Sequence, residues 1–285
     1  MLILRSSNVI LLVLFFLAGS SVLQAQNSLL KRTTYKTDTV EFGSGGTFSI
    51  IGSPNGSIEV EGWQKNQIEV SAEIIVEAEN ESDLALLASV VGFLTDTGFA
   101  HTRIISVGPN DKKYLKSVSK KFPKHLISMP FQINYKVKVP MFCDLEIDGG
   151  NGDISLSKVE GTMRIKALAA NAKLELVGGT MVAAFGTGTV EVSIPKPSWR
   201  GRNVDIQLVS GTMSVNLPKN LNAELEARVL RTGQIENGLK DLKKKDRAEF
   251  SDKWIVAKSG GGGASLNFMV GDGTLKLSEI SPPAK

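Results

Sequence analysis

The middle of the chain repeats a five-residue pattern every nine residues. Each copy starts with a glycine or an alanine and then reads polar, apolar, polar, apolar. The copies begin at Gly152, Gly161, Ala170, Gly179 and Gly188. A strand with this pattern has one apolar side, and it can hide that side from water only by stacking on similar strands. The repeat therefore predicts an all-β architecture of short stacked strands.

Alternate residues of a strand point to opposite sides of a sheet, so the repeat divides into two sets of side chains. The apolar set, expected in the core, is Ile154, Leu156, Met163, Ile165, Ala172, Leu174, Met181, Ala183, Val190, Val192, Met213 and Val215. The set expected outside is Asp153, Ser155, Thr162, Arg164, Asn171, Lys173, Thr180, Val182, Thr189, Glu191, Thr212 and Ser214.

Two arrangements can hold five-residue strands joined by turns of about four residues. In a β-solenoid, two strands make one coil of eighteen residues, and equivalent strands stack about 4.8 Å apart. Asn171 then lies beside Asp153 and Thr189, and Thr162 beside Thr180 on the opposite face. In an antiparallel β-sandwich, successive strands pair as hairpins. The rows of like residues favour the β-solenoid, with the sandwich as the alternative.

The remaining sequence divides into a few further segments. Residues 26–45 are expected to form a loose lead-in, residues 46–278 a single β-repeat domain, and residues 279–285 a C-terminal tail. Period-two alternation predicts strands over residues 68–76 and 131–139, with an acidic and a basic outer face. We expect these two strands to pair, and Glu73 and Lys136 are the charges chosen to test the pairing.

One helix is expected within this β-rich sequence. Apolar residues between Glu79 and Leu94 recur at helical spacing, and Ser82 is the predicted N-cap. We expect this amphipathic helix to cover an end or a face of the stack. The lysine-rich stretch Lys112–His125 is expected to be a basic loop, and a solvated loop is favoured over contact with an anionic surface.

The N-terminus has the pattern of a secretory signal peptide. Arg5 precedes a short apolar run, and small residues follow before Ala25, where we expect cleavage. An uncleaved membrane anchor is the alternative, but the run is shorter than the ~20 residues that a span needs. Nucleic-acid binding usually needs a basic stripe, which the modest net charge of +4 does not by itself show, so no nucleic-acid partner is expected. We therefore expect a periplasmic or secreted protein with no transmembrane segment after cleavage.

Several segments together resemble the bacterial "putative adhesin" repeat domains, a family of exported β proteins of unknown function. The resemblance covers residues 46–278, although Gln64 stands where the family has Asp. It implies a right-handed β-solenoid-like fold and a location in the cell envelope. The segments that carry it, in the family's order, are Ile58–Trp63, the helical stretch Ser82–Leu94, Val137–Pro140, Leu145–Leu156, Gly260–Phe268 and Gly271–Leu277.

No catalytic, cofactor-binding or metal-binding set is predicted. The acidic turn with Asp144, Asp148 and Asp153 has too few expected oxygen ligands for calcium, so a strand-entry turn is favoured. Glu59 and Glu61, with Asp148 and Asp153, are considered as carboxylates for glycan cleavage, but alternating acidic residues are more typical of a solvated strand face.

The other reactive or aromatic residues also have structural interpretations. Cys143 is the single cysteine and is expected to be buried, and only His101 and His125 could activate it. The glycines at 260–263 are expected to form a flexible turn and the repeat methionines to fill the core. Trp63, Trp199 and Trp254 are expected to pack against turns, with sugar binding as the alternative.

These observations predict a non-catalytic, extracytoplasmic β-repeat protein. Its expected role is structural, adhesive or interactive, with an envelope polysaccharide or protein as the partner. A carbohydrate-active enzyme on a β-helix and a periplasmic accessory of envelope sensing are the alternatives.

Overall fold

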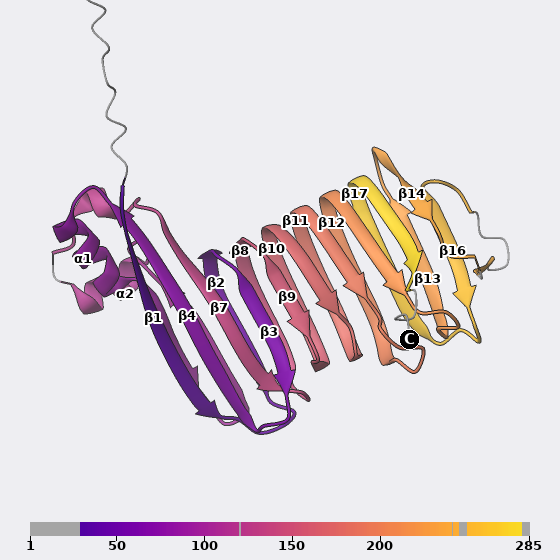
Figure 1. Ribbon diagram of the computed structural model, residues 1–285, viewed down its shortest axis with the longest axis horizontal. Coiled ribbons are helices and arrows are strands. Elements are labelled where there is room, and N and C mark those ends of the chain that lie inside the picture. Colours follow the sequence, from indigo (N-terminus) through magenta and orange to yellow (C-terminus); the bar gives the residue numbers. More distant parts are fainter. Residues whose placement is uncertain (1–28, 120, 241, 245–249, 281–285) are drawn as a thin grey trace, which may run out of the picture.

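The computed structural model describes residues 29–280, apart from residues 120, 241 and 245–249. The described residues form a long row of strands with two short helices at the N-terminal end (Figure 1). The all-β prediction is therefore confirmed. The signal peptide predicted for residues 1–25 lies outside the described residues. Within the described part, no helix has the length and apolar character needed to cross a bilayer.

The strands form two faces joined at corners. Listed from the N-terminal end of the stack, the first face contains β5 (Gly92–Thr97), β6 (His101–Val107), β2 (Thr47–Asn55), β8 (Asp144–Asn151), the first halves of β10 (Glu160–Glu175), β11 (Gly178–Ser193), β12 (Arg200–Leu217) and β17 (Ala264–Glu279), and then β13 (Ala223–Val229), β16 (Trp254–Ser259) and β15 (Lys243–Lys244). The second face contains β1 (Leu30–Glu41), β4 (Gln67–Ala78), β7 (Phe131–Pro140), β3 (Ile58–Trp63), β9 (Ile154–Ser157), the second halves of β10, β11, β12 and β17, and β14 (Gly233–Asn237).

Successive strands in the middle of each face are parallel and keep the predicted register. Thr162 lies opposite Thr180, and Asn171 lies opposite Thr189, eighteen residues further along the chain in both cases. Asn171 Nδ2 donates to Asp153 Oδ1 at 3.2 Å, which continues the second row. The predicted eighteen-residue register is thus confirmed. Each long strand runs along the first face, turns a corner and returns along the second face.

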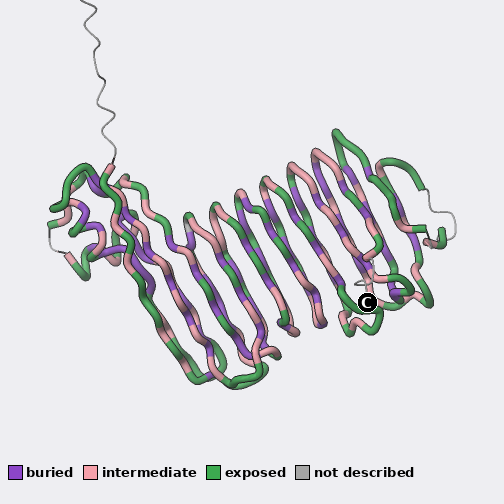
Figure 2. Tube along the Cα trace, in the orientation of Figure 1, coloured by how far each residue is buried: buried purple, intermediate pink, exposed green. Residues whose placement is uncertain are grey.

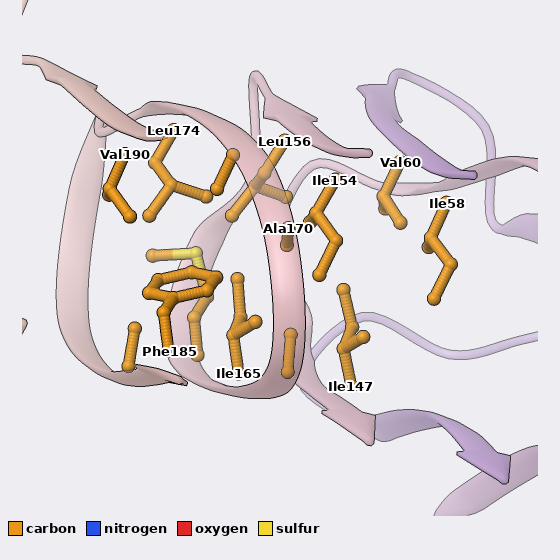
Figure 3. Packing of buried hydrophobic residues seen from close by; sticks show 14 of the residues in the cluster. Ile58, Val60, Ile147, Ile154, Leu156, Ile165, Ala170, Leu174, Phe185 and Val190 are labelled. Atoms are coloured by element: carbon orange, nitrogen blue, oxygen red, sulfur yellow. The ribbon is translucent and has the colours of Figure 1, made fainter. Parts of the chain in front are cut away.

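The core lies between the two faces. Its side chains meet from both faces in layers, as Phe185 and Val190 do (Figure 3). Ile154, Met163 and Val190 are at most 3% exposed, so the apolar positions of the repeat face inward as predicted. Burial colours alternate along the strands in the middle of the stack (Figure 2). Removal of this alternating apolar surface from water is the main stabilising term of the fold.

Glycines form a ladder at the corner that leads into the second face. Gly188 and Gly211 have φ angles of +129° and +140°, a region that L side chains rarely adopt. A Cβ at Gly211 would also overlap the carbonyl oxygen of Gly188 on the neighbouring strand. Glycine is therefore a steric requirement at Gly188 and Gly211, whereas Ala170 occupies the same corner on β10. Further glycines with positive φ in this ladder are Gly56, Gly152, Gly233 and Gly273.

The N-terminal end of the stack is closed by polar side chains of β1. Residues 30–41 form this twelve-residue strand, so the prediction of a loose lead-in was wrong there. Lys36 Nζ donates to the Phe93 carbonyl at 2.6 Å, and Thr95 Oγ1 donates to Asp38 Oδ2 at 2.5 Å. These bonds connect β1 on the second face to β5 on the first. Because β1 turns polar residues toward the interior, it lacks the apolar alternation by which strands are recognised.

Helix α1 (Glu81–Val90) covers the same end and packs against β4 and β1. Leu84, Leu87 and Val90 are its buried residues, which confirms an amphipathic helix at the end of the stack. Its boundaries differ from the prediction. Asn80, rather than Ser82, accepts the N-cap hydrogen bond, and the chain re-enters a strand at Gly92, so the helix does not reach Leu94.

The expected basic loop over residues 112–125 contains a second helix, α2 (Lys112–Val118), and a 3-10 turn (Lys124–Leu126). Asp111 caps α2 by accepting hydrogen bonds from the backbone N–H groups of Lys113 and Tyr114. Leu115 and Leu126 are buried. The prediction of a loop was wrong because seven residues with one apolar anchor give too short a periodic signal.

The expected pairing of the acidic and basic strands is confirmed. Strands β4 and β7 are antiparallel, and Glu69 lies opposite Lys138 with 3.7 Å between Oε1 and Nζ. The chosen charge pair was wrong. Lys136 lies opposite Ser71 and its Nζ is 3.9 Å from Glu59 on β3, whereas Glu73 accepts a hydrogen bond from Asn134.

A double-mutant cycle can test the corrected pairing. Glu69→Lys or Lys138→Glu alone should each destabilise the protein by about 0.2–1 kcal/mol, and the exchanged pair should recover most of the loss. Urea unfolding followed by circular dichroism measures each free energy. The control exchanges Glu73 and Lys136, and a coupling energy in that pair but none between positions 69 and 138 would contradict the assignment.

Candidate interaction surfaces

The second face presents a flat set of polar rows. Thr189, Thr212 and Thr274 lie opposite one another on β11, β12 and β17, about 4.8 Å apart from strand to strand. Asn171 precedes them and Gln234 follows them in the same row. All twelve side chains predicted to face outward are at least partly exposed. The face therefore offers hydroxyl and amide groups at a regular spacing.

Charged residues surround this row, and many of them are paired. Lys158 Nζ donates to Glu61 Oε1 at 2.5 Å, and this hydrogen bond lowers the pKa of the Glu61 carboxyl. Lys173 lies opposite Ser155 and Glu191 in the adjacent row. Both signs of charge are thus distributed along the face.

The structure does not bring the four candidate carboxylates together. Glu59 and Glu61 lie on β3 beside lysines, and Asp153 accepts from Asn171 on the second face. Asp148 lies on β8 of the first face, opposite Lys166. The described residues contain no group of three or more acidic, histidine or cysteine side chains placed to hold a metal ion.

The single cysteine lies in the core. Cys143 is 1% exposed, and burial, with a contribution from the Asp144 charge, raises the pKa of its thiol to about 12. The two histidines have other surroundings. His125 Nε2 is 3.0 Å from Asp83 Oδ2, and His101 is the first residue of β6. The expected burial of Cys143 is confirmed.

This burial predicts slow alkylation. At about pH 8 the folded protein should react with iodoacetamide orders of magnitude more slowly than the protein unfolded in urea, because the thiolate is the reactive form. The folded thiol keeps its proton above the ordinary pKa of about 8.5, so its contribution to stability should fall as pH rises from there toward 12. Mass spectrometry of timed samples measures the reaction, and equal rates in both states would contradict the placement.

An apolar hollow lies at the corner between the two faces, and the sequence analysis did not identify it. Its volume is about 560 Å³. Phe185 and Ala167 line it together with the exposed side chains of Leu168 and Val209. Ser53 also lines it, with a buried hydroxyl that has no hydrogen-bond partner. The sequence signal for this hollow was an apolar residue, Leu168 or Val209, at a position where the alternation of the strand predicts an outward side chain.

The three tryptophans differ in their surroundings. Trp63 donates to the Gln67 carbonyl at 2.8 Å, and Trp254 donates to Glu226 at 3.2 Å. Turn packing thus describes Trp63 well. Trp199 is half-buried beside a second hollow of about 410 Å³, which Lys196 and Arg200 also line. At the other predicted turn, residues 260–263 connect β16 to β17 as expected.

Comparison with known proteins gives similarity at the level of structure. No family model matches the sequence, and no curated protein matches it. A putative cell adhesion protein from Clostridium sporogenes is 14% identical, with a TM-score of 0.47 over 87% of this chain and 100% of the other. A putative adhesin from Bacteroides fragilis is 10% identical, with a TM-score of 0.29 over 87% and 97%.

A third solved structure has a different description. It is a putative lipid binding protein from Parabacteroides distasonis, 10% identical, with a TM-score of 0.26 over 87% of this chain and 97% of the other. The solved structures similar to this chain are thus described mainly as putative adhesins or cell adhesion proteins, the kind of protein that the sequence resembles.

Proposed function

We propose that this protein is a non-catalytic, extracytoplasmic interaction module whose domain is a right-handed β-solenoid. In this proposal a rigid stack of coils presents its second face to an extended partner, and an envelope polysaccharide is the partner that suits the face best. The expected signal peptide supports export to the periplasm or the cell surface.

The parallel register supports the solenoid. Residues eighteen apart lie side by side on both faces, and each long strand contributes to both. Capping also fits, since a stack of this kind needs covered ends. Polar β1 residues and α1 lie at one end, and Leu239 and Leu242 pack against the core at the other.

The row Asn171–Thr189–Thr212–Thr274–Gln234 is the observation that carries the proposed function. Its groups repeat along a straight line with the spacing of the strands, so a ligand with repeating hydroxyl groups can meet several of them at once. Each contact is weak in water, and many aligned contacts provide affinity through effective concentration. Among the four candidate carboxylates, Asp148 lies on the first face and the other three lie on the second, where Glu59 and Glu61 pair with lysines and Asp153 accepts from Asn171. This exposed, charge-paired arrangement favours binding over the acid and base pair of glycan cleavage.

A retention assay tests the function. The purified protein is passed over immobilised polysaccharides, and eluted glycans are analysed for shortened chains. The variant Thr189→Val/Thr212→Val/Thr274→Val keeps the shape of the row and removes its hydroxyls. We expect retention without cleavage for the natural protein and at least about tenfold weaker retention for the variant, roughly 1.4 kcal/mol.

The matched control is Thr162→Val/Thr180→Val, which removes two stacked hydroxyls from the first face. The control should bind as the natural protein does. Equal loss in both variants, or unchanged binding in the triple variant, would contradict the role of the second face. Cleavage that Asp148→Asn or Asp153→Asn abolishes would replace the proposal with the carbohydrate-active enzyme.

A further inference from the structure

One corner of the stack carries alternating glycines and exposed aliphatic residues. The six positions lie next to one another on successive strands, and we call them the corner ridge. Leu168, Val209 and Leu230 are 69%, 57% and 55% exposed. In their spatial order the ridge residues are Gly150, Leu168, Gly186, Val209, Gly271 and Leu230.

The order follows from the strand register. Ala167 pairs with Phe185 and Ala169 with Thr187, so Leu168 lies beside Gly186. Phe185 pairs with Leu208 and Thr187 with Ser210, so Val209 lies on the other side of Gly186. Neighbouring positions are about 4.8 Å apart, and the aliphatic side chains are therefore separated by about 9.6 Å.

Two of the three glycine positions, Gly150 and Gly186, are open, whereas Gly271 is buried beside the Arg231 guanidinium. The 560 Å³ hollow is lined by Gly150 and Gly186 together with the flanking Leu168 and Val209. The ridge is thus a row of apolar projections with depressions between them. Three large aliphatic side chains lie in one line, and each is more than half exposed.

We propose that the corner ridge binds the corner ridge of a second copy of this chain, in antiparallel orientation, about a two-fold axis between Gly186 and Val209. Reversing the six positions about this point places an aliphatic residue opposite a glycine at every position. Val209 then enters the depression at Gly186 of the partner subunit, and Leu230 enters the depression at Gly150 of the partner subunit. A two-fold interface requires this kind of self-complementarity.

The spacing argues for a second copy over other apolar partners. Projections about 9.6 Å apart fit depressions with the same period, and another stack of the same strands has that period by construction. A lipid chain or an unrelated peptide does not have this period. The symmetric contact also gives no open-ended assembly, because it uses the same patch on both subunits.

The rows beside the ridge are compatible with this axis. On the first-face side, the row runs from Asp148 and Lys166 to Met269 and Arg228. Under the proposed symmetry Asp148 lies opposite Arg228 of the partner subunit, an attractive pair, and the symmetry repeats this pair once. At the Gly271 position the guanidinium of Arg231, which binds Asp272, lies close to the ridge, and Leu168 of the partner subunit would pack against it.

The interface is small. Six positions span about 24 Å along the ridge. A single line of side chains of this length buries less than the roughly 800 Å² per partner that is typical of stable complexes. The dimer is therefore of the weak, transient class. Chemical trapping is consequently the most direct test.

Disulfide trapping uses the symmetry itself. The natural chain contains one cysteine, which is buried, so introduced cysteines can be followed without ambiguity. Asn151→Cys and Thr232→Cys lie beside opposite ends of the ridge, and the proposed axis brings them together only between two different subunits. A mixture of the two single variants, oxidised with copper phenanthroline, should give a disulfide-linked dimer, whereas each variant alone should give at least about tenfold less.

Substitution of the ridge provides the second measurement. Adding Leu168→Asp and Val209→Asp to both trapping variants should remove the cross-link, and sedimentation velocity should show loss of the concentration-dependent self-association of the natural protein. Phe142→Asp is the control, because Phe142 is 55% exposed at a different position and should leave both results unchanged. Thermal unfolding confirms that each variant is folded.

Three results would overturn the proposal. The first is the absence of a cross-link in the mixture. The second is equal cross-linking in each variant alone, which would require another geometry. The third is a monomeric natural protein that binds phosphatidylcholine vesicles and loses this binding with Leu168→Asp and Val209→Asp, since the ridge would then be a lipid-binding surface.

Discussion

Gly211→Ala is expected to lower the midpoint of thermal unfolding by roughly 10 °C or more, which corresponds to a loss above about 3 kcal/mol. The φ angle of +140° disfavours any L side chain, and the added methyl group would overlap the Gly188 carbonyl oxygen. The Gly188 carbonyl belongs to the backbone of the adjacent strand β11, and it cannot move aside without disturbing the strand pairs on both sides of β11. Circular dichroism during heating measures the midpoint.

Gly43→Ala is the matched control. Gly43 has no atom within 4 Å of an added Cβ, and its φ angle is not in the positive range. The control should unfold within about 2 °C of the natural protein, because an exposed substitution without a steric conflict changes stability by at most about 0.5 kcal/mol. A Gly211→Ala variant as stable as this control would refute the steric account of the corner.

Phe185→Ala is expected to cost about 3–5 kcal/mol of unfolding free energy. The Phe185 ring is 2% exposed and occupies the interior between the two faces (Figure 3). Truncation leaves a cavity that parallel strands, fixed by backbone hydrogen bonds on both sides, cannot close. Urea unfolding measures the loss, and Phe185→Leu should recover a large part of it.

Val182→Ala on the same strand provides the comparison. Val182 is 44% exposed on the first face, and its truncation should change stability by no more than about 0.5 kcal/mol. If the two truncations had equal effects, the inward and outward assignment of β11 would be incorrect.

The repetitive part of the fold could be predicted from the sequence because its signal is local and redundant. The alternation that places Met163 inside and Thr162 outside recurs in each copy of the repeat, and the glycine or alanine that begins each copy marks a turn. The eighteen-residue register followed from adding two nine-residue units. Consistency between the pattern, the turn chemistry and the packing is typical of a sequence that specifies one structure.

The ends could not be predicted in the same way. Lys36 and Asp38 on β1 close the end of the stack through hydrogen bonds to β5, and only the tertiary structure reveals those partners. Helix α2 is too short for its periodicity to be recognised. The Lys136–Glu73 choice was wrong because alternation identifies the face of a strand but not which strand lies on its other side.

The candidate surfaces show the same division. The outward rows of the second face followed from alternation, and the part of the row formed by Asp153, Asn171 and Thr189 was expected. The corner ridge was not, because residues that neighbour one another in it are separated by 18–62 positions in the chain, and their order depends on insertions of different length between paired strands. Leu168 and Val209 become neighbours of Gly186 only when the register is known.

The repeated register of β10 and β11 has a consequence for how a protein of this kind changes its length. The apolar residues of β11 lie beside those of β10 after eighteen residues, so a duplicated eighteen-residue repeat at this point would meet matching apolar neighbours on both sides. The specialised polar strand and helices at one end, and the leucines at the other, would be unaffected. Genetic gain or loss of whole coils is thus the mildest route by which such a chain can become longer or shorter.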